Sequence, residues 1–272
     1  MIIGNKNFDL ENNTYVMGIL NVTPDSFSDG GLYNNIDSAL RQTEKMIKDG
    51  ASIIDVGGES TRPNHTKIGI NEEIDRVASS IEAIKKNFDI PVSLDTYKAD
   101  VLKANIDNID MINDIWGLKW ESSYAPLVAS SSLPYVLMHN RKKLDYTNFS
   151  EDLYSDLKES LVIAKKAGIK DETIIIDGGV GFQKTYEQNL ITLKNTKELK
   201  KLGYPIMVAV SNKSVIGLTL DKDVNHRLFG TLATTAYAIM EGASFVRVHD
   251  VAANYEIIKM IQSIKAERKW IQ

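Results

Sequence analysis

The stretch MGILNVTPDSFSDGG, residues 17–31, joins a short apolar run to a small, polar segment that ends in glycine. Its first half is long enough for one buried strand, and its second half has the composition of a loop. A strand therefore presents Asn21 to an acidic loop. In an α/β barrel, chemistry is normally built at the C-terminal ends of the parallel strands and in the loops that follow them. The rest of the chain decides whether this plan is repeated.

The plan recurs along the whole chain. Apolar runs predict further strands at 52–56, 91–95, 109–113, 135–139, 173–177, 206–211 and 245–249. Apolar residues at helical spacing predict helices between them, at 35–49, from 71 onward, and at 97–106, 121–131, 149–167, 185–202, 225–241 and 253–268. Four of the strands are preceded by a glycine placed as a helix C-cap, namely Gly50, Gly168, Gly203 and Gly242. Eight strand-then-helix units imply parallel strands joined by right-handed crossovers.

An open, doubly wound sheet shares this alternation, so the strand ends decide between the two architectures. Each predicted strand ends at or near polar residues: Asn21, Glu59 with Arg62, Asp95, Asn113 with Asp114, His139, Asp177, Lys213, and Arg247 with His249. These side chains converge if the strands close into a ring, whereas an open sheet scatters them along an edge. We therefore predict an α/β fold, a single (β/α)8 TIM barrel over residues 1–272. Residues 1–15 are expected to form a short N-terminal extension over the barrel bottom.

The composition excludes several classes of protein and site. The 272 residues are 43% hydrophobic and 25% charged, as in globular domains, and the net charge is −4 with no basic stripe. We therefore expect no nucleic-acid partner. The absence of cysteine excludes disulfides, thiolate metal sites and a thiol nucleophile. No apolar run approaches the roughly 18 residues of a membrane helix, so we expect a cytoplasmic protein with no membrane partner.

Three polar residues are the first candidates for chemistry. Asp95, Asn113 and Asp177 each follow three or four apolar residues, which predicts that they lie half-desolvated at the barrel mouth. Any one of them is equally consistent with capping a helix or binding loop amides. Together they suit a flat nitrogen heterocycle with amide and amino edges, because charge-assisted hydrogen bonds contribute roughly 1.5 to 3 kcal/mol each.

A second group of residues suits an anion. Arg247 and His249 alternate on the last strand and therefore point to the same side, next to Asn21 on the first strand of a closed barrel. The alternative is an inward salt bridge from Arg247 to Asp250 or Glu59. Lys213 follows the seventh strand, and its position is consistent with either a ligand contact or a solvated loop charge.

The same region is compatible with one kind of metal. The residues after His139 do not have the spacing of transition-metal ligands. Mg2+ is different, since one or two protein oxygens and substrate phosphates suffice to bind it. Asn21 and Asp29 carry suitable oxygens.

Seven motifs identify a resemblance that covers nearly the whole chain. They are NVTPDSFSDGG from Asn21, DVGGESTRP from Asp55, DTYK from Asp95, IND from Ile112, MHNR from Met138, GVGF from Gly179 and VRVHDV from Val246. In this order they resemble the dihydropteroate synthase family. The resemblance implies a barrel that joins 6-hydroxymethyl-7,8-dihydropterin pyrophosphate to p-aminobenzoate in folate biosynthesis and releases pyrophosphate. It also implies a homodimer that pairs through outer helices, and a p-aminobenzoate site that sulfonamides share.

The resemblance also implies a role for each matching residue. The pterin ring is expected to contact Asp95, Asn113, Met138, Asp177 and Lys213. The catalytic residues are expected to be Asn21, Asp29, Arg247, His249 and Lys213, with pyrophosphate bound there and Mg2+ held at Asn21. p-Aminobenzoate is expected to lie against Phe27, Thr61, Arg62, Pro63, Phe182 and Ser214.

Two departures from the family pattern leave alternatives open. Gly178 stands where the family usually has proline, and Asn212 stands where it usually has arginine. A pterin-binding homologue without activity is therefore one alternative. A methyltransferase that uses a folate and a corrinoid protein is another, although methyl transfer has no pyrophosphate to be held by Arg247 and His249.

Overall fold

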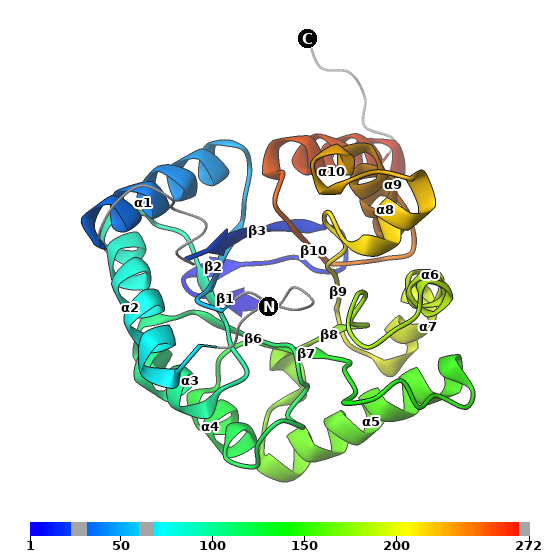
Figure 1. Cartoon of the computed structure of the whole chain (residues 1–272), viewed down its shortest axis with the longest axis horizontal. Helices are drawn as coiled ribbons and strands as arrows, with labels where there is room; N and C mark the ends of the chain where they lie inside the picture. The colour runs from blue at the N-terminus through cyan, green and yellow to red at the C-terminus, as the bar shows by residue number, and fades with distance from the viewer. Residues whose placement is uncertain (23–31, 60–67, 267–272) are drawn as a thin grey trace.

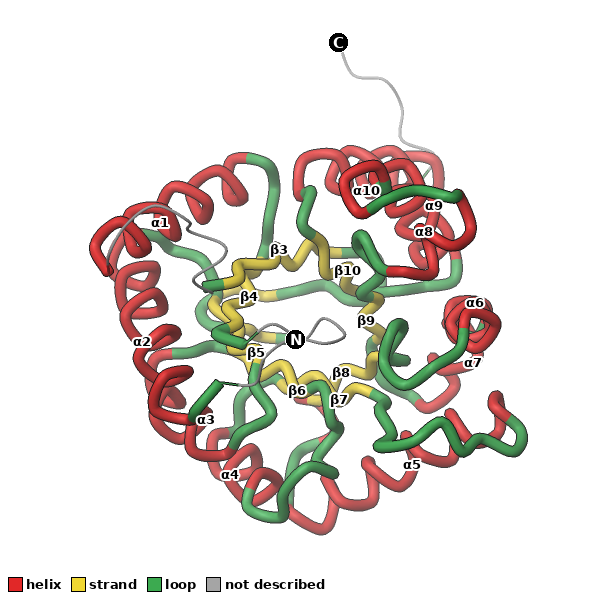
Figure 2. Tube along the Cα trace, in the orientation of Figure 1, coloured by secondary structure: helices red, strands yellow, loops and turns green. Residues whose placement is uncertain are grey.

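Eight parallel strands close into a barrel in the computed structural model, which describes residues 1–22, 32–59 and 68–266. The strands follow one another around the ring in chain order, and the last pairs with the first (Figure 2). They are β3 (Tyr15–Asn21), β4 (Ile53–Gly57), β5 (Val92–Asp95), β6 (Met111–Asp114), β7 (Tyr135–Met138), β8 (Ile174–Asp177), β9 (Ile206–Val208) and β10 (Phe245–Val248). The predicted closed (β/α)8 barrel is confirmed.

Helices surround the barrel on its outside (Figure 1). They are α1 (Leu32–Lys48), α2 (Ile70–Asn87), α3 (Ala99–Asn105), α4 (Tyr124–Ser131), α5 (Phe149–Ala167), α6 (Tyr186–Lys194), α7 (Thr196–Leu199), α8 (Ser214–Leu220), α9 (Leu228–Met240) and α10 (Val251–Lys265). Short 3-10 turns lie at Ile106–Asn108, Asp171–Thr173, Lys200–Leu202 and Val224–His226. Among the described residues, no helix is long and apolar enough to cross a membrane.

Two of the predicted helices were wrong in extent. The helix expected over 185–202 is two helices, α6 and α7, which break at Asn195. The helix expected over 225–241 begins only at Leu228, and α8 precedes it unpredicted. α8 has seven residues, which is too short for a periodic signal in the sequence. The four predicted C-cap positions, in contrast, are glycines with φ between 88° and 103°.

The side chains of the strands alternate between two cores. Outward residues such as Leu20, Ile54 and Val56 pack against the helices. Inward residues form a separate cluster inside the ring, made of Met17, Ile53, Met111, Val136, Ile175, Met207 and Phe245. The N-terminal hairpin of β1 (Ile2–Ile3) and β2 (Lys6–Asn7) adds Ile3 and Phe8 to this cluster. The extension therefore closes the barrel bottom, as predicted, and the mouth at the other end is where polar groups can lie.

Candidate active site

The inward face of four strands changes from apolar to polar toward the barrel mouth. Because successive residues of a strand point to opposite sides, a residue two positions after an inward residue is again inward. The apolar member of each pair belongs to the inner cluster, and the pairs are Ile53 and Asp55, Met111 and Asn113, Ile175 and Asp177, and Phe245 and Arg247. The polar layer thus lies directly next to the apolar cluster inside the ring, on the side of the barrel mouth.

The centre of this layer is a buried cation held by two carboxylates. Arg247 places Nε 2.6 Å from Oδ2 of Asp55 and Nη2 2.6 Å from Oδ2 of Asp95. Asn113 donates from Nδ2 to the same Asp55 oxygen at 3.1 Å. Asp55 is completely buried, so its charge depends on these donors. A compact network therefore connects β4, β5, β6 and β10.

The charges of this network shift one another. Burial opposes the charged form of Arg247, but Asp55 and Asp95 outweigh it and raise the pKa of the guanidinium. Burial raises the pKa of Asp95, helped by repulsion from Asp55, although Arg247 acts in the other direction. A single cation thus faces two carboxylates, and Asp95 is the one that takes up a proton more readily than an ordinary aspartate.

A second polar group lies at the ends of β8 and β9. Oδ1 of Asp177 accepts a hydrogen bond from the Gly179 backbone N–H at 2.7 Å. Lys213 donates from Nζ to the Val180 carbonyl at 2.5 Å and lies over the ring of Phe182, 4.8 Å from its centroid. Burial raises the pKa of Asp177 and lowers the pKa of Lys213 to about 8, while each charge counteracts the shift of the other.

An apolar wall stands beside these groups. Met138, at the end of β7, is buried and packs in a small cluster with Tyr97 and Ile115. Phe182 and Trp116 pack against this cluster from the outside. The mouth therefore combines charged acceptors and donors with a flat apolar surface.

The remaining predicted residues occupy the rim. Asn21, Gly57, Asp95 and Asn113 are register partners on four neighbouring strands, which brings Asn21 into the same row as two of the pterin candidates. His249 lies just beyond β10, with Nδ1 3.0 Å from the Ser211 hydroxyl. Ser214 is exposed as the first residue of α8.

Five predicted site residues lie outside the described residues: Phe27, Asp29, Thr61, Arg62 and Pro63. Glu59 and Ile68, the described residues on either side of 60–67, are held in place by hydrogen bonds. Lys98 donates from Nζ to Glu59 at 2.8 Å, to Glu73 at 2.6 Å and to the Ile68 carbonyl at 3.0 Å. The backbone N–H of Ile68 in turn donates to Glu59 at 3.1 Å.

Several ion-pair partners and one site residue differ from those expected from the sequence. Asp250 and Glu59 were the suggested partners of an inward Arg247, but the partners are Asp55 and Asp95, and Glu59 pairs with Lys98 instead. Asp55 was missed as a site residue, although a charged residue inside the apolar run IIDVG is a readable signal. The three pterin candidates are buried rather than half-desolvated, with 8% of Asp95 and 3% each of Asn113 and Asp177 exposed.

The two departures from the family pattern have local explanations. A Cβ at Gly178 would lie 2.7 Å from Cγ2 of Thr192, so the position has little room rather than a loose backbone. Asn212 has a φ of 58°, a left-handed conformation that asparagine tolerates better than most residues. Its backbone carbonyl accepts a hydrogen bond from Arg227 at 2.9 Å.

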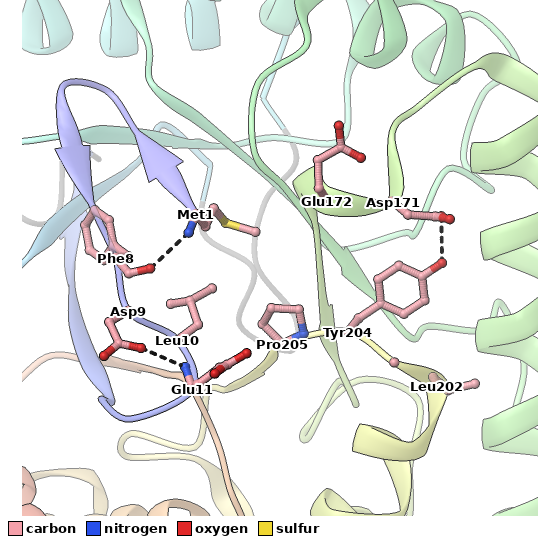
Figure 3. A pocket seen from close by; sticks show the side chains of 11 residues that line it. Met1, Phe8, Asp9, Leu10, Glu11, Asp171, Glu172, Leu202, Tyr204 and Pro205 are labelled. Carbon is pink, nitrogen blue, oxygen red and sulfur yellow. Dashed lines mark hydrogen bonds between the residues drawn. The ribbon is translucent and has the colours of Figure 1, made fainter.

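A cavity at the opposite end of the barrel has a different character. It has a volume of about 700 Å³ and lies between the N-terminal extension and the start of β9 (Figure 3). Its lining includes the carboxylates of Asp9, Glu11, Asp171 and Glu172, and Asp171 accepts a hydrogen bond from Tyr204 at 2.8 Å. Polar strand ends do not converge there, so the mouth remains the candidate active site.

Comparison with known proteins agrees with this choice. The family model described as "Pterin binding enzyme" matches residues 17–249. A dihydropteroate synthase of Clostridium beijerinckii is 53% identical over 266 residues, covering 97% of this chain and 99% of its own. The chain is also similar to two solved structures, both of dihydropteroate synthases. The structure from Clostridium difficile, determined in the presence of pteroic acid, has a TM-score of 0.92 at 45% identity and covers 95% of this chain and 99% of its own. The structure from Xanthomonas albilineans with 4-aminobenzoic acid has a TM-score of 0.89 at 35% identity and covers 94% of each chain.

Proposed function

This chain belongs to the dihydropteroate synthase family of pterin-binding enzymes, and we propose that the residues at its barrel mouth carry out that family's reaction as follows. The enzyme is a transferase that condenses 6-hydroxymethyl-7,8-dihydropterin pyrophosphate with p-aminobenzoate to give dihydropteroate and pyrophosphate. One observation carries the assignment of roles. Charged and amide groups from five different strand ends meet above the apolar plug, namely Asp95, Asn113, Asp177, Lys213 and Arg247.

The pterin ring lies between the two buried carboxylates. Its amino and ring N–H groups donate to Asp95 and Asp177, its carbonyl accepts from Lys213, and Asn113 supplies an amide that can do either. Met138 contacts one face of the ring. Burial of these groups strengthens each hydrogen bond, because water does not compete for them.

The pyrophosphate lies on the rim beside the ring. Arg247 carries the permanent positive charge of this part of the site. His249 lies just beyond the end of the same strand, β10, and Asn21 ends the neighbouring strand, β3. As the bond between the pterin methylene carbon and the pyrophosphate oxygen breaks, the electron pair leaves with the oxygen. Arg247 stabilises the negative charge that develops there.

The oxygen donors on the rim fit Mg2+ bound together with the substrate. Mg2+ is commonly held by one or two protein oxygens and by phosphate oxygens. The described residues contain no group of three or more acidic or histidine side chains that could hold a metal without substrate. Asn21, with its amide oxygen at the end of β3, would hold the ion, which when bound neutralises charge on the departing pyrophosphate.

p-Aminobenzoate approaches from the side of β8 and β9. Its ring lies against Phe182, and its carboxylate lies near Ser214 in the first turn of α8. The other residues expected to contact it, Phe27, Thr61, Arg62 and Pro63, lie outside the described residues. Sulfonamides carry a similar aniline, so we expect them to compete for this half of the site.

Attack by the amine completes the reaction. The lone pair of the p-aminobenzoate nitrogen forms the new bond to the pterin methylene carbon, and the nitrogen then loses a proton to solvent. The carboxylates of Asp95 and Asp177 favour the positive charge that the pterin carries between departure and attack. No covalent enzyme intermediate is required.

The outer surface supports a homodimer. Of the large hydrophobic side chains that are exposed among the described residues, most lie between Leu218 and Ile264, on α8, α9 and α10. Phe229 is 82% exposed and Met240 is 63% exposed, and α8, α9 and α10 lie together on one side of the barrel (Figure 1). We propose that a second copy of the chain covers this face, and Phe229→Glu should then yield monomers in analytical ultracentrifugation.

The test of function is a turnover assay with both substrates and Mg2+ that follows pyrophosphate and dihydropteroate in the same reaction. The expected result is equal amounts of both products, which stop forming when Mg2+ is chelated and form again when it is restored. Pterin binding without either product would overturn the assignment and favour a binding protein.

A further inference from the structure

Lys184 is a cation that the proposed reaction does not use. It lies in the loop between β8, which ends at Asp177, and α6, two residues after Phe182. Its Nζ lies 2.9 Å from Nδ1 of His139, 2.8 Å from the Gly179 carbonyl and 3.0 Å from the Phe182 carbonyl. An ammonium has three N–H donors, and each of them has an acceptor here.

The acceptor His139 is fixed from its other side. Its Nε2 lies 2.9 Å from Oδ2 of Asp156 on α5, and the imidazole is completely buried. While Lys184 is protonated it can only donate to Nδ1, so the ring proton then lies on Nε2 and points to Asp156. Arg141 in turn donates to Asp156 at 2.6 Å. A chain of contacts therefore runs from the outer helix α5 through His139 to Lys184.

Protonation agrees with this direction of the hydrogen bonds. Burial, together with the charge of Lys184, lowers the pKa of His139 to about 4, so the imidazole is neutral at pH 7. Burial lowers the pKa of Lys184 to about 7, although Asp177 favours its charged form. The ammonium of Lys184 thus costs desolvation energy that a purely structural contact could avoid with a neutral side chain.

The loop that Lys184 binds is the one that shapes half of the proposed site. The two carbonyls that it holds, of Gly179 and Phe182, are the ends of one turn, closed by the Phe182 N–H bond to Gly179 at 3.2 Å. Between them lies Val180, whose carbonyl receives Lys213 at 2.5 Å. A Cβ at Gly179 would overlap the His139 carbonyl oxygen, so the turn passes directly over the end of β7.

We propose that Lys184 is a positioning residue for the p-aminobenzoate half of the site. Held by His139 and Asp156, its ammonium fixes the turn 179–182, so that the Phe182 ring and the Val180 carbonyl stand in place before substrate arrives. The proposal rests on the function assigned above. It adds a residue that touches no substrate but sets the geometry of those that do.

The first test compares Lys184→Met with the unaltered enzyme. Methionine keeps an unbranched side chain, one heavy atom shorter than that of lysine, and removes all three donors. We expect the KM for p-aminobenzoate to rise about tenfold or more, because a displaced binding group loses most of its contribution. The dissociation constant of the pterin pyrophosphate, measured by calorimetry, should rise by a clearly smaller factor than this KM, because Asp95, Asn113 and Arg247 hold it from β5, β6 and β10, away from the turn. Lys201→Met, on an exposed surface lysine paired with Glu198, is the matched control.

A second pair of variants separates positioning from folding. His139→Asn keeps an acceptor near the place of Nδ1 and should retain a KM for p-aminobenzoate close to that of the unaltered enzyme. His139→Leu removes the acceptor and should behave like Lys184→Met. If Lys184→Met does not fold, this pair still decides the matter, because equal KM values for the two variants would overturn the proposal.

Two results distinguish the proposal from the function on which it rests. If the unaltered protein makes no dihydropteroate, the proposed function fails before Lys184 is tested. If it turns over and Lys184→Met leaves the KM for p-aminobenzoate unchanged, or raises it only in parallel with the pterin constant, the positioning role alone is wrong.

Discussion

Arg247 on β10 and Asp95 on β5 are ion-paired in the barrel mouth, with Nη2 2.6 Å from Oδ2, although 152 residues separate them in the chain. Asp55 holds the same guanidinium from β4. The cation proposed to stabilise the leaving group is thus prepared between two carboxylates before any substrate binds. Its position is fixed by the barrel rather than by its own flexible side chain, and such preorganisation is what makes a buried charge effective in a transition state.

Removal of Arg247 should therefore affect the chemical step most. For Arg247→Ala we expect kcat to fall by roughly a hundredfold to a thousandfold, the usual effect of losing one group that stabilises developing charge. Steady-state kinetics with saturating substrates checks this. Arg41→Ala, on an exposed arginine of α1, is the control and should be neutral. A kcat for Arg247→Ala within about threefold of the unaltered enzyme would contradict the role.

His139 makes stability depend on pH in a defined window. Its pKa is about 4 in the folded protein and 6.5 ordinarily, so the unfolded chain binds more protons between these values. Stability therefore falls as the pH drops from about 6.5 to 4, by about 2 to 3 kcal/mol for this residue. Asp156 and Lys184 are the charged groups within hydrogen-bond distance of the two ring nitrogens.

Urea unfolding at pH 7 and pH 4 tests this expectation. The difference in unfolding free energy between the unaltered protein and His139→Asn should shrink on acidification, because asparagine does not titrate. A difference that stays constant between the two pH values would show that the imidazole takes up its proton at the same pH in the folded protein as in the unfolded chain, so that its pKa is not lowered by folding.

Removal of the largely buried Lys98 should lower the stability of the folded protein strongly. Its partners Glu59 and Glu73 have side chains only 4% and 1% exposed, so Lys98→Met removes a contacting cation from two buried carboxylates. We expect the free energy of unfolding to fall by about 3 to 5 kcal/mol in denaturant titrations. Lys85→Met, in a more exposed pair with Asp110, should cost less than about 1 kcal/mol. Equal costs for the two variants would be evidence against the buried network.

Gly178 should be intolerant of a side chain because of Thr192. For Gly178→Ala we expect a loss of about 1 to 3 kcal/mol, as for other overpacked core positions. Thr192→Ser removes the methyl group that lies 2.7 Å from the added Cβ, so the double variant should regain part of the loss, while the contact with Cδ1 of Leu199 at 3.2 Å remains. Gly69→Ala is the control, since a Cβ there meets no atom of the described residues within 4 Å. A double variant no more stable than Gly178→Ala would disprove the steric explanation.

Much of the site could be predicted because it follows from local order in the chain. Asp95, Asn113 and Asp177 each end an apolar run, and a run that ends in a polar residue marks the mouth of a parallel barrel. The structure buries all three at the ends of their strands. Lys184 gave no such signal, because a lysine in a polar loop looks the same whether it is solvated or bound to a histidine 45 residues away.

The repeated strand-and-helix units and the polar end of each strand can be read from the sequence, since both depend on the spacing of apolar residues over a few positions. Which charges meet depends on the tertiary structure. Arg247 joins Asp55 and Asp95 because β10 closes onto β3 and sets the register of four neighbouring strands. Pairing across a closed barrel depends on strand register and ring closure, and neither is a property of any local stretch of the chain.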